Sequence, residues 1–418
     1  MKNKNFLPSF FVRAFNFREN HKKNPRAFLC VFLSIFVFIQ STNAELVSSD
    51  KFGWTIDFPE YFILEDATED ERSALFSNQI VPVQVVIRVY EQSRYNDAAS
   101  ALKSTLLKLS ASAQDAEIKW RNRDCALAQF TIPQNVLGTS QKGWAVSIPL
   151  QDEKSVNYFV ILSYAPEENA FDLEQFILSV LDCVMVDRGS FYEAGIITSF
   201  AFPKSSEEQV NLKIAGKEIQ TKIDKDDSDA NQFVVEREFS VFKIYAATSQ
   251  WQEAWKRFYR IIAKDAFGRM KKPAFDIYTS LMSTAASQNP SNPDAAFSQL
   301  LLTWIQDFKY ETKSVTADKA DFMNIPSVLK NEGSDCDSRA LLLMVLLKNS
   351  GIDACMFVSV EYSHALLGVF LEGAQGQSYN LDGKDYLFGE TTAKGLTLGM
   401  IRADMQDRSK WIPVEMAE

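Results

Sequence analysis

Residues 333–351 have the sequence GSDCDSRALLLMVLLKNSG, in which a turn, a cysteine and a long apolar run follow one another. Gly333 and Ser334 are typical of a turn, and Ser334 or Asp335 can cap a helix. Residues 340–347 are all apolar, which predicts a helix buried on all its faces, and Gly351 is a suitable residue to end this helix. Cys336 is therefore expected in the first turn of a central helix.

A thiol at this place faces unpaired backbone N–H groups and the positive end of the helix dipole. Both favour the thiolate, which is the nucleophilic form of cysteine. Asp335 and Asp337 flank Cys336 and oppose this effect with their negative charges. We therefore expect Cys336 to need a partner if it is to react at neutral pH.

Outside the first 44 residues the chain has one histidine, His364, which follows Cys336 by 28 residues. It begins the apolar segment 364–371, which comes after another apolar segment at 354–360, and both are typical of buried strands. A histidine at the start of a strand and facing a helix N-terminus can form a thiolate–imidazolium pair with a cysteine. The alternative for each residue alone is a structural role in the core.

Several motifs between residues 293 and 400 resemble the transglutaminase-like domains of bacterial papain-type cysteine enzymes. They are Trp304 with Tyr310-Glu311, Pro326, the segment 333–343, Gly351-Ile352, His364-Ala365 and Glu390-Thr391-Thr392. The resemblance implies that Cys336 is the catalytic nucleophile, His364 the base and Glu390 the acid that orients the histidine. Ser334 stands where the family often has glycine.

Asp382 is the rival for the orienting acid. Asp382-Gly383 is a turn signal between two short strands, and Asp382 would lie beside His364 if the strand at 378–381 paired with the histidine strand. Glu390 requires its own strand to be the neighbour, and the Glu-Thr-Thr match favours it. Tyr310 and Trp304 are candidates for lining the pocket, with core packing as the alternative for Trp304.

No cofactor and no metal are expected. The chain has no C-x-x-C pair, and its cysteine, histidine and aspartates lack the ordered spacing of a zinc site. Cys125 and Cys183 form either a disulfide or two buried thiols.

The rest of the chain predicts a multidomain α+β protein. Strand-like segments at 83–90, 125–132 and 156–164, with helix-like segments at 97–109 and 170–181, indicate an α+β domain over residues 45–186. Its opening, residues 53–59, and its order of elements resemble the PsbP-like domains. Residues 187–250 are predicted to be a β-rich middle region, with a hairpin at 210–223 and a strand at 233–245. Aromatic residues at helical spacing then predict that residues 251–418 are a helical lead-in and the transglutaminase-like domain.

Residues 1–44 have the pattern of a secretory signal peptide, with basic residues first, an apolar run at 27–39 and small residues at 42–44. We expect a periplasmic or secreted protein without a stable membrane span after signal removal; an uncleaved N-terminal anchor is the alternative. The remaining residues include 37 basic and 53 acidic ones, a formal charge of −16. Such an acidic surface argues against non-specific binding to nucleic acid.

Together these features predict a cysteine enzyme that performs acyl transfer or hydrolysis on peptide or protein amides, with cell-envelope components as candidate substrates. The alternative is a catalytically silent transglutaminase-like protein that serves as an envelope scaffold or binds peptides.

Overall fold

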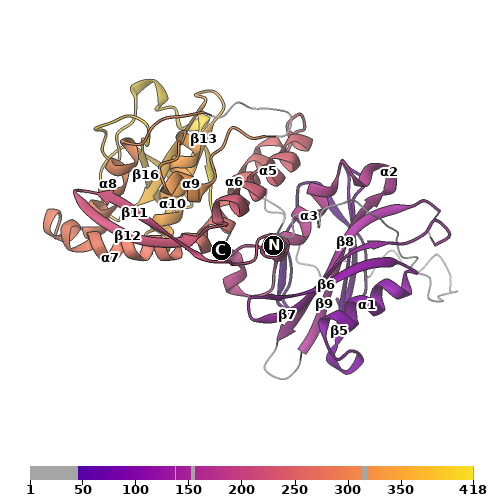
Figure 1. The fold of residues 1–418 in the computed structure, drawn as a ribbon. Coiled ribbons are helices and arrows are strands. Elements are labelled where there is room, and N and C mark those ends of the chain that lie inside the picture. The colour runs from indigo at the N-terminus through magenta and orange to yellow at the C-terminus, as the bar shows by residue number, and fades with distance from the viewer. Residues whose placement is uncertain (1–45, 137, 152–155, 313–318, 418) are drawn as a thin grey trace. The chain divides into compact units, whose positions relative to one another are not determined.

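The computed structural model describes residues 46–136, 138–151, 156–312 and 319–417 (Figure 1). The chain divides between Leu181 and Asp182 into two compact units. Both units combine helices with antiparallel sheets, so the predicted multidomain α+β class is confirmed. The predicted signal peptide, residues 1–44, lies outside the described residues. No helix in the described ranges is long and apolar enough to cross a membrane.

The first unit is built on a seven-stranded antiparallel sheet with the strand order β3-β4-β5-β9-β8-β7-β6. Helix α1 (Ala98–Lys108) covers one face of this sheet, and its Leu102 and Leu106 belong to a buried cluster with residues of β7, β8 and β9 (Figure 1). The strands are β3 (Phe62–Ala67), β4 (Ser73–Asn78), β5 (Gln84–Glu91), β6 (Ser112–Trp120), β7 (Arg123–Thr131), β8 (Gln141–Gln151) and β9 (Val156–Pro166). The smaller elements are β1 (Leu46–Ser49), β2 (Trp54–Asp57), α2 (Glu167–Ala170) and α3 (Glu174–Asp182).

The structure confirms the strands predicted at 83–90, 125–132 and 156–164, which are β5, β7 and β9, and the helix predicted at 97–109, which is α1. The helix predicted at 170–181 is present as α3, but it begins at Glu174, because a turn at 171–173 separates it from α2. The four cysteines of the described residues are all buried, and no disulfide joins Cys125 to Cys183.

The second unit begins with a hairpin and a series of helices that precede its sheet. They are the hairpin β11 (Glu207–Ile214) and β12 (Lys217–Asp224), then α5 (Asp227–Tyr245), α6 (Trp251–Arg269), α7 (Lys271–Gln288) and α8 (Pro293–Gln306). Shorter elements are β10 (Val184–Met185), α4 (Ile196–Ala201) and α9 (Ile325–Leu329). Asn292 caps α8, since its side chain accepts a hydrogen bond from the Ala295 N–H at 3.0 Å, and Pro293 is the first helical residue.

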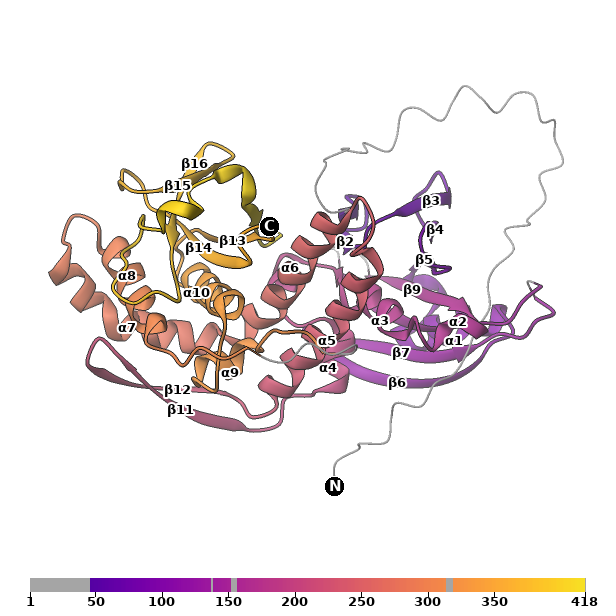
Figure 2. The same ribbon diagram turned by 90° about the horizontal axis from the view of Figure 1, so that it is seen from above.

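Helix α10 (Cys336–Asn349) lies at the centre of this unit (Figure 2). It contacts α6, α7, α8 and α9, together with strands β13 and β14. Its residues 340–347 are at most 1% exposed, as their uniformly apolar character predicts. The helix is therefore held from all sides, and its first turn is fixed relative to the sheet.

The five-stranded antiparallel sheet of the second unit has the order β15-β16-β14-β13-β17. Its strands are β13 (Ala354–Ser359), β14 (His364–Phe370), β15 (Ser378–Leu381), β16 (Lys384–Gly389) and β17 (Ile412–Val414). β14 lies between β13 and β16, so the neighbours of the histidine strand are these two and not β15.

The prediction of a β-rich middle region over residues 187–250 is wrong in its second half. The hairpin at 210–223 is present, with Ala215 and Gly216 at positive φ in its two-residue turn. Residues 233–245, predicted as a strand, belong instead to α5. The β-branched and aromatic residues there suggested a strand, but two buried charges, Arg237 and Glu238, occupy interior positions of the helix and pair with each other at 2.7 Å.

Candidate active site

Cys336 is the first residue of α10, and the turn before it is tightly specified. Asp335 and Ser338 form a reciprocal cap: Asp335 Oδ1 accepts from the Ser338 N–H at 2.9 Å, and Ser338 Oγ accepts from the Asp335 N–H at 3.1 Å. Gly333 has a φ of +112°, and a Cβ there would lie 3.2 Å from a carboxylate oxygen of Glu311. Glycine and the cap therefore fix where the helix begins and where the cysteine stands.

His364 begins β14, and its ring is bonded to Glu390. The distance from His364 Nε2 to Glu390 Oε2 is 2.8 Å. Glu390 directly follows β16, which pairs with β14 in a register that places Gly389 opposite Leu367. The neighbouring strand therefore delivers the carboxylate to the histidine across 26 residues of sequence.

The Glu390 carboxylate is itself held in place. It is 2% exposed, and its Oε1 accepts hydrogen bonds from the N–H and the hydroxyl of Thr392 at 2.8 and 2.7 Å. Burial acts to raise the Glu390 pKa, but the bonds from His364 and Thr392 outweigh it and bring the pKa below its ordinary value. An ionised Glu390 fixes the ring orientation and leaves the other nitrogen, Nδ1, for proton exchange.

Asp382 does not reach the histidine. It lies in the two-residue turn between β15 and β16, where both it and Gly383 have positive φ. The turn leads into β16, whereas Glu390 directly follows β16, so Asp382 lies at the other end of this strand from Glu390. Of the two candidate acids, the structure brings Glu390 to His364.

The Cys336 thiol lies beside the start of the histidine strand and is bonded to an aspartate. Cys336 is 7% exposed, and its Sγ donates to Asp337 Oδ1 at 3.1 Å. The backbone N–H of Ala365, the residue after His364, also bonds to the sulfur. Among the described residues no hydrogen bond joins Cys336 to His364 directly.

The surroundings of Cys336 raise its pKa, in contrast to the expected stabilisation of the thiolate. Burial is the largest cause, and the charge and hydrogen bond of Asp337 come next, ahead of Asp335. Burial and the charge of Asp337 in turn raise the pKa of Asp335 to about 6. Burial and the two carboxylates together therefore outweigh the helix N-terminus and favour the neutral thiol of Cys336 over the thiolate.

Tyr310 lies next to the cysteine. Its segment runs alongside Ser334, with the Glu311 N–H donating to the Ser334 carbonyl at 2.9 Å. The phenol bonds to Cys336, and burial of the hydroxyl, together with this bond, raises the Tyr310 pKa to about 12. Although 53% of the Tyr310 residue is exposed, its hydroxyl is thus placed at the thiol and stays protonated. Trp304, in contrast, is buried and packs edge-on against Phe308 with ring centroids 4.8 Å apart.

Arg339 is a site residue that the sequence motifs do not single out. Its guanidinium is 1% exposed and donates three hydrogen bonds: to Ser334 Oγ at 2.8 Å, to the Phe308 carbonyl at 2.7 Å and to the Thr391 carbonyl at 3.2 Å. It also lies over the Tyr310 ring, 5.5 Å from the centroid. Arg339 therefore joins the segments that carry Tyr310, Cys336 and Glu390. The available signal was a lone arginine at the edge of an apolar helix.

Tyr259 of α6 is a second residue of the site that the sequence motifs did not identify. Its hydroxyl donates to Asp337 Oδ2, and its ring is 2% exposed. It appeared in the sequence only as one member of an aromatic stripe, and the stripe gave no sign that one hydroxyl is bonded to a site residue.

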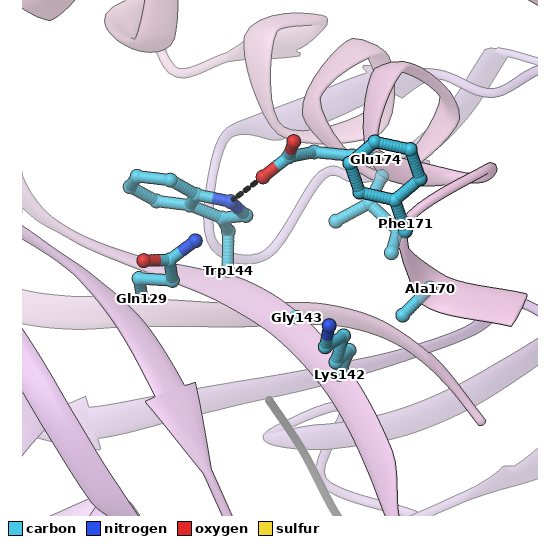
Figure 3. Close-up of a pocket in the computed structure, with 8 residues that line it drawn as sticks. Gln129, Lys142, Gly143, Trp144, Ala170, Phe171 and Glu174 are labelled. Carbon is cyan, nitrogen blue, oxygen red and sulfur yellow. Dashed lines mark hydrogen bonds between the residues drawn. The ribbon is translucent and has the colours of Figure 1, made fainter. Parts of the chain in front are cut away.

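Elsewhere, the first unit has a shallow pocket between β8 and the segment of α2 and α3 (Figure 3). Trp144 Nε1 donates to Glu174 Oε1 at 3.3 Å within it, and Phe171 beside them is 70% exposed. Lys142 and Glu174 are the ionisable groups in its lining. The pocket contains no cysteine or histidine and does not offer the chemistry of the Cys336 region.

Comparisons with known proteins give only distant likenesses. No family model matches the chain, and no curated protein matches it. The PsbP protein of the cyanobacterium Synechocystis is similar with a TM-score of 0.28 and 10% identity, over 37% of this chain and 99% of that one. The yeast Ran-binding protein Mog1p has a TM-score of 0.26 and 12% identity, over 34% and 95% of the two chains. LpqN of Mycobacterium tuberculosis, described as involved in cell envelope biogenesis, has a TM-score of 0.26 and 11% identity, over 34% and 88%.

Proposed function

We propose that this chain is a transglutaminase-like cysteine enzyme that transfers or hydrolyses acyl groups of peptide or protein amides. The observation that carries the proposal is the bond from Glu390 to His364, on a strand whose next residue, Ala365, bonds to the sulfur of Cys336. A cysteine, a histidine and an acid that orients the histidine are the parts that nucleophilic acyl transfer needs. Here they come from α10, β14 and the end of β16.

In the proposed reaction His364 Nδ1 takes the proton of Cys336 as the sulfur attacks the amide carbonyl. The carbon–nitrogen bond then breaks, His364 gives the proton to the leaving amine, and a thioester to Cys336 remains. Water yields a carboxylic acid, whereas a second amine yields a new amide, and both routes release the thiol. Glu390 keeps the imidazole in the required tautomer throughout.

The carbonyl oxygen gains negative charge during the attack and needs donors. The Cys336 backbone N–H, in the first turn of α10, is one candidate. The Tyr310 hydroxyl is the other, since it already bonds to Cys336 and its raised pKa keeps the proton in place. The predicted signal peptide adds a periplasmic or secreted location, and with it peptides or proteins of the cell envelope as substrates.

The test is labelling with an electrophilic peptide-amide probe, followed by peptide mapping. Cys336 should be labelled in the wild-type protein, and His364→Ala should reduce the labelling rate. Cys125, Cys183 and Cys355 are buried and serve as internal references. If Cys336 reacts no faster than these three, or if His364→Ala leaves its rate unchanged, the proposed enzyme function is wrong.

A silent scaffold or peptide-binding protein is the second candidate, and the neutral, 7% exposed thiol of Cys336 favours it. For such a protein Cys336→Ser should preserve binding of envelope peptides, and neither variant nor wild type should release amine from them. Release of amine that is lost in Cys336→Ser would support the enzyme and contradict the scaffold.

A further inference from the structure

Asp337 has two carboxylate oxygens with two different partners. Oδ1 accepts the Cys336 thiol at 3.1 Å, and Oδ2 accepts the hydroxyl of Tyr259. The bond from Tyr259 ties the first turn of α10 to the middle of α6. They also leave each oxygen of Asp337 occupied by a donor.

Tyr259 has little freedom to release this bond. Its ring is enclosed by other aromatic rings, with centroid distances of 5.0 Å to Phe258, 5.9 Å to Trp255 and 6.0 Å to Phe322. Packing of this kind fixes the direction of the hydroxyl and lowers the local dielectric, which strengthens the bond to a carboxylate. The position of Asp337 is therefore set from α6, independently of the histidine strand.

We propose that Asp337, held by Tyr259, is a positioning residue that keeps Cys336 as a protonated thiol at rest and so sets the pH at which the sulfur becomes reactive. The inference rests on the proposed function only in taking Cys336 as the reacting group. Asp337 and His364 then compete for one thiol hydrogen, and transfer to His364 requires the bond to Asp337 to break.

Other charged and titratable groups also surround the thiol. Asp335, which directly precedes Cys336, also disfavours the thiolate, but its carboxylate bonds to Ser338 and not to the sulfur. Arg339, on the same helix, favours the thiolate through its positive charge, although its hydrogen bonds go to Ser334 and to two backbone carbonyls. The remaining groups are Tyr310 before the turn, Tyr259 on α6, Asp321 before α9, His364 on β14 and Glu390 after β16.

Asp337 also acts on His364, in the opposite sense. Its negative charge attracts a protonated imidazole. Burial raises the pKa of Asp337 above its ordinary value, and the bonds from Tyr259 and Cys336 and the charge of His364 act against this rise. This interaction acts through space, whereas Asp337 accepts the thiol hydrogen directly. Removing the charge of Asp337 should therefore help the thiolate more than it weakens the imidazolium.

The experiment is the rate of Cys336 alkylation by iodoacetamide as a function of pH, followed by peptide mapping. Asp337→Asn keeps the shape and removes the charge, and should move the midpoint of the profile down by roughly one to three pH units. Below both midpoints this is about a tenfold faster reaction for each unit. Glu361→Gln is the matched control, because it removes an exposed carboxylate from the turn before His364 and should leave the midpoint unchanged.

Asp335→Asn separates contact from charge alone, since asparagine still caps the helix. Its shift should be smaller than that of Asp337→Asn; an equal or larger shift would overturn the inference, as would an unchanged midpoint in Asp337→Asn. If Asp337→Asn does not fold, the alkylation profile of Tyr259→Phe is measured in its place. A midpoint equal to that of the wild-type protein then contradicts the proposed role of Tyr259 and Asp337. Alkylation needs no substrate, so a shifted profile without amide turnover refutes the proposed function alone, and turnover with an unshifted profile refutes this inference alone.

Discussion

Replacing Arg339 with methionine should destabilise the second unit and loosen the candidate site. The variant loses the hydrogen bonds to Ser334, to the Phe308 carbonyl and to the Thr391 carbonyl. Methionine is of similar length and fills the space of the side chain without replacing any of these donors. The change therefore tests whether one buried guanidinium holds three segments together.

The magnitude follows from two opposing terms. A hydrogen bond from a charged donor contributes about 1.5–3 kcal/mol, so three independent bonds would amount to about 4.5–9 kcal/mol. Arg339 forms no salt bridge within the described residues, and burying its charge costs several kcal/mol, which methionine avoids. We expect a net loss of about 2–4 kcal/mol, a size that is typical of a broken buried network.

Urea unfolding followed by tryptophan fluorescence measures this loss. With about 1–3 kcal/mol per molar urea, the transition of the second unit should move down by roughly 1–2 M. Arg402→Met is the matched control, because Arg402 pairs with Asp404 at a surface where both side chains are 62% exposed, and its loss should cost about 0–1 kcal/mol. If Arg339→Met unfolds within about 0.5 kcal/mol of this control, the three bonds do not hold the segments together.

Three further predictions concern other parts of the site. The pKa of Glu390 is lower in the folded protein than in the unfolded chain, so Glu390 stabilises the fold above its unfolded-state pKa. This stability is lost as the pH falls through the folded-state pKa, and Glu390→Gln should therefore flatten the decline in urea midpoint between about pH 5 and 3. Glu390→Gln should also lower amide turnover by about 10²-fold or more, whereas Asp382→Asn should leave it within about twofold; equal losses would contradict the assignment of the orienting acid. Gly333→Ala should cost about 1–3 kcal/mol in urea unfolding, because a side chain at a φ of +112° is strained and its Cβ meets Glu311; a stability equal to wild type would show that the turn adapts.

The sequence predicted those parts of the fold that depend on local pattern. The apolar run 340–347 predicted a buried helix because eight adjacent apolar residues leave no polar face. The cap expected from Ser334 or Asp335 likewise marked the start of α10, and Asp335 is the residue that forms it. The strand order β15-β16-β14-β13-β17, which selects Glu390 over Asp382, depends on long-range pairing that no local pattern encodes.

The errors and omissions arise where buried polar groups replace apolar ones. In α5, Arg237 and Glu238 are about 1% exposed and form ion pairs with each other, with Asp182 and with Arg257. The buried face of this helix therefore contains charged residues at positions where a helical pattern would have apolar ones. Arg339 and Tyr259 escaped notice for the same reason, since their partners are carbonyls and a carboxylate distant in sequence. A polar group deep in a core is intelligible only once its partners are known.

The balance of charges at Cys336 also bears on how the proposed reaction starts. A helix N-terminus stabilises an adjacent anion by about 0.3–1 kcal/mol and by at most about 2 kcal/mol. A carboxylate about 4 Å away opposes an anion by about 4 kcal/mol at an effective dielectric constant of 20. Since Asp337 is in hydrogen-bond contact with the thiol, its effect exceeds that of the helix, and burial of the sulfur adds to it, so the thiol is favoured over the thiolate before substrate binds. The proposed enzyme would therefore begin with general-base proton transfer to His364 during the attack, as in serine hydrolases, and not with a preformed ion pair. A solvent isotope effect of about two or more on acylation would accompany such a transfer, and its absence would indicate a thiolate already present in the free protein.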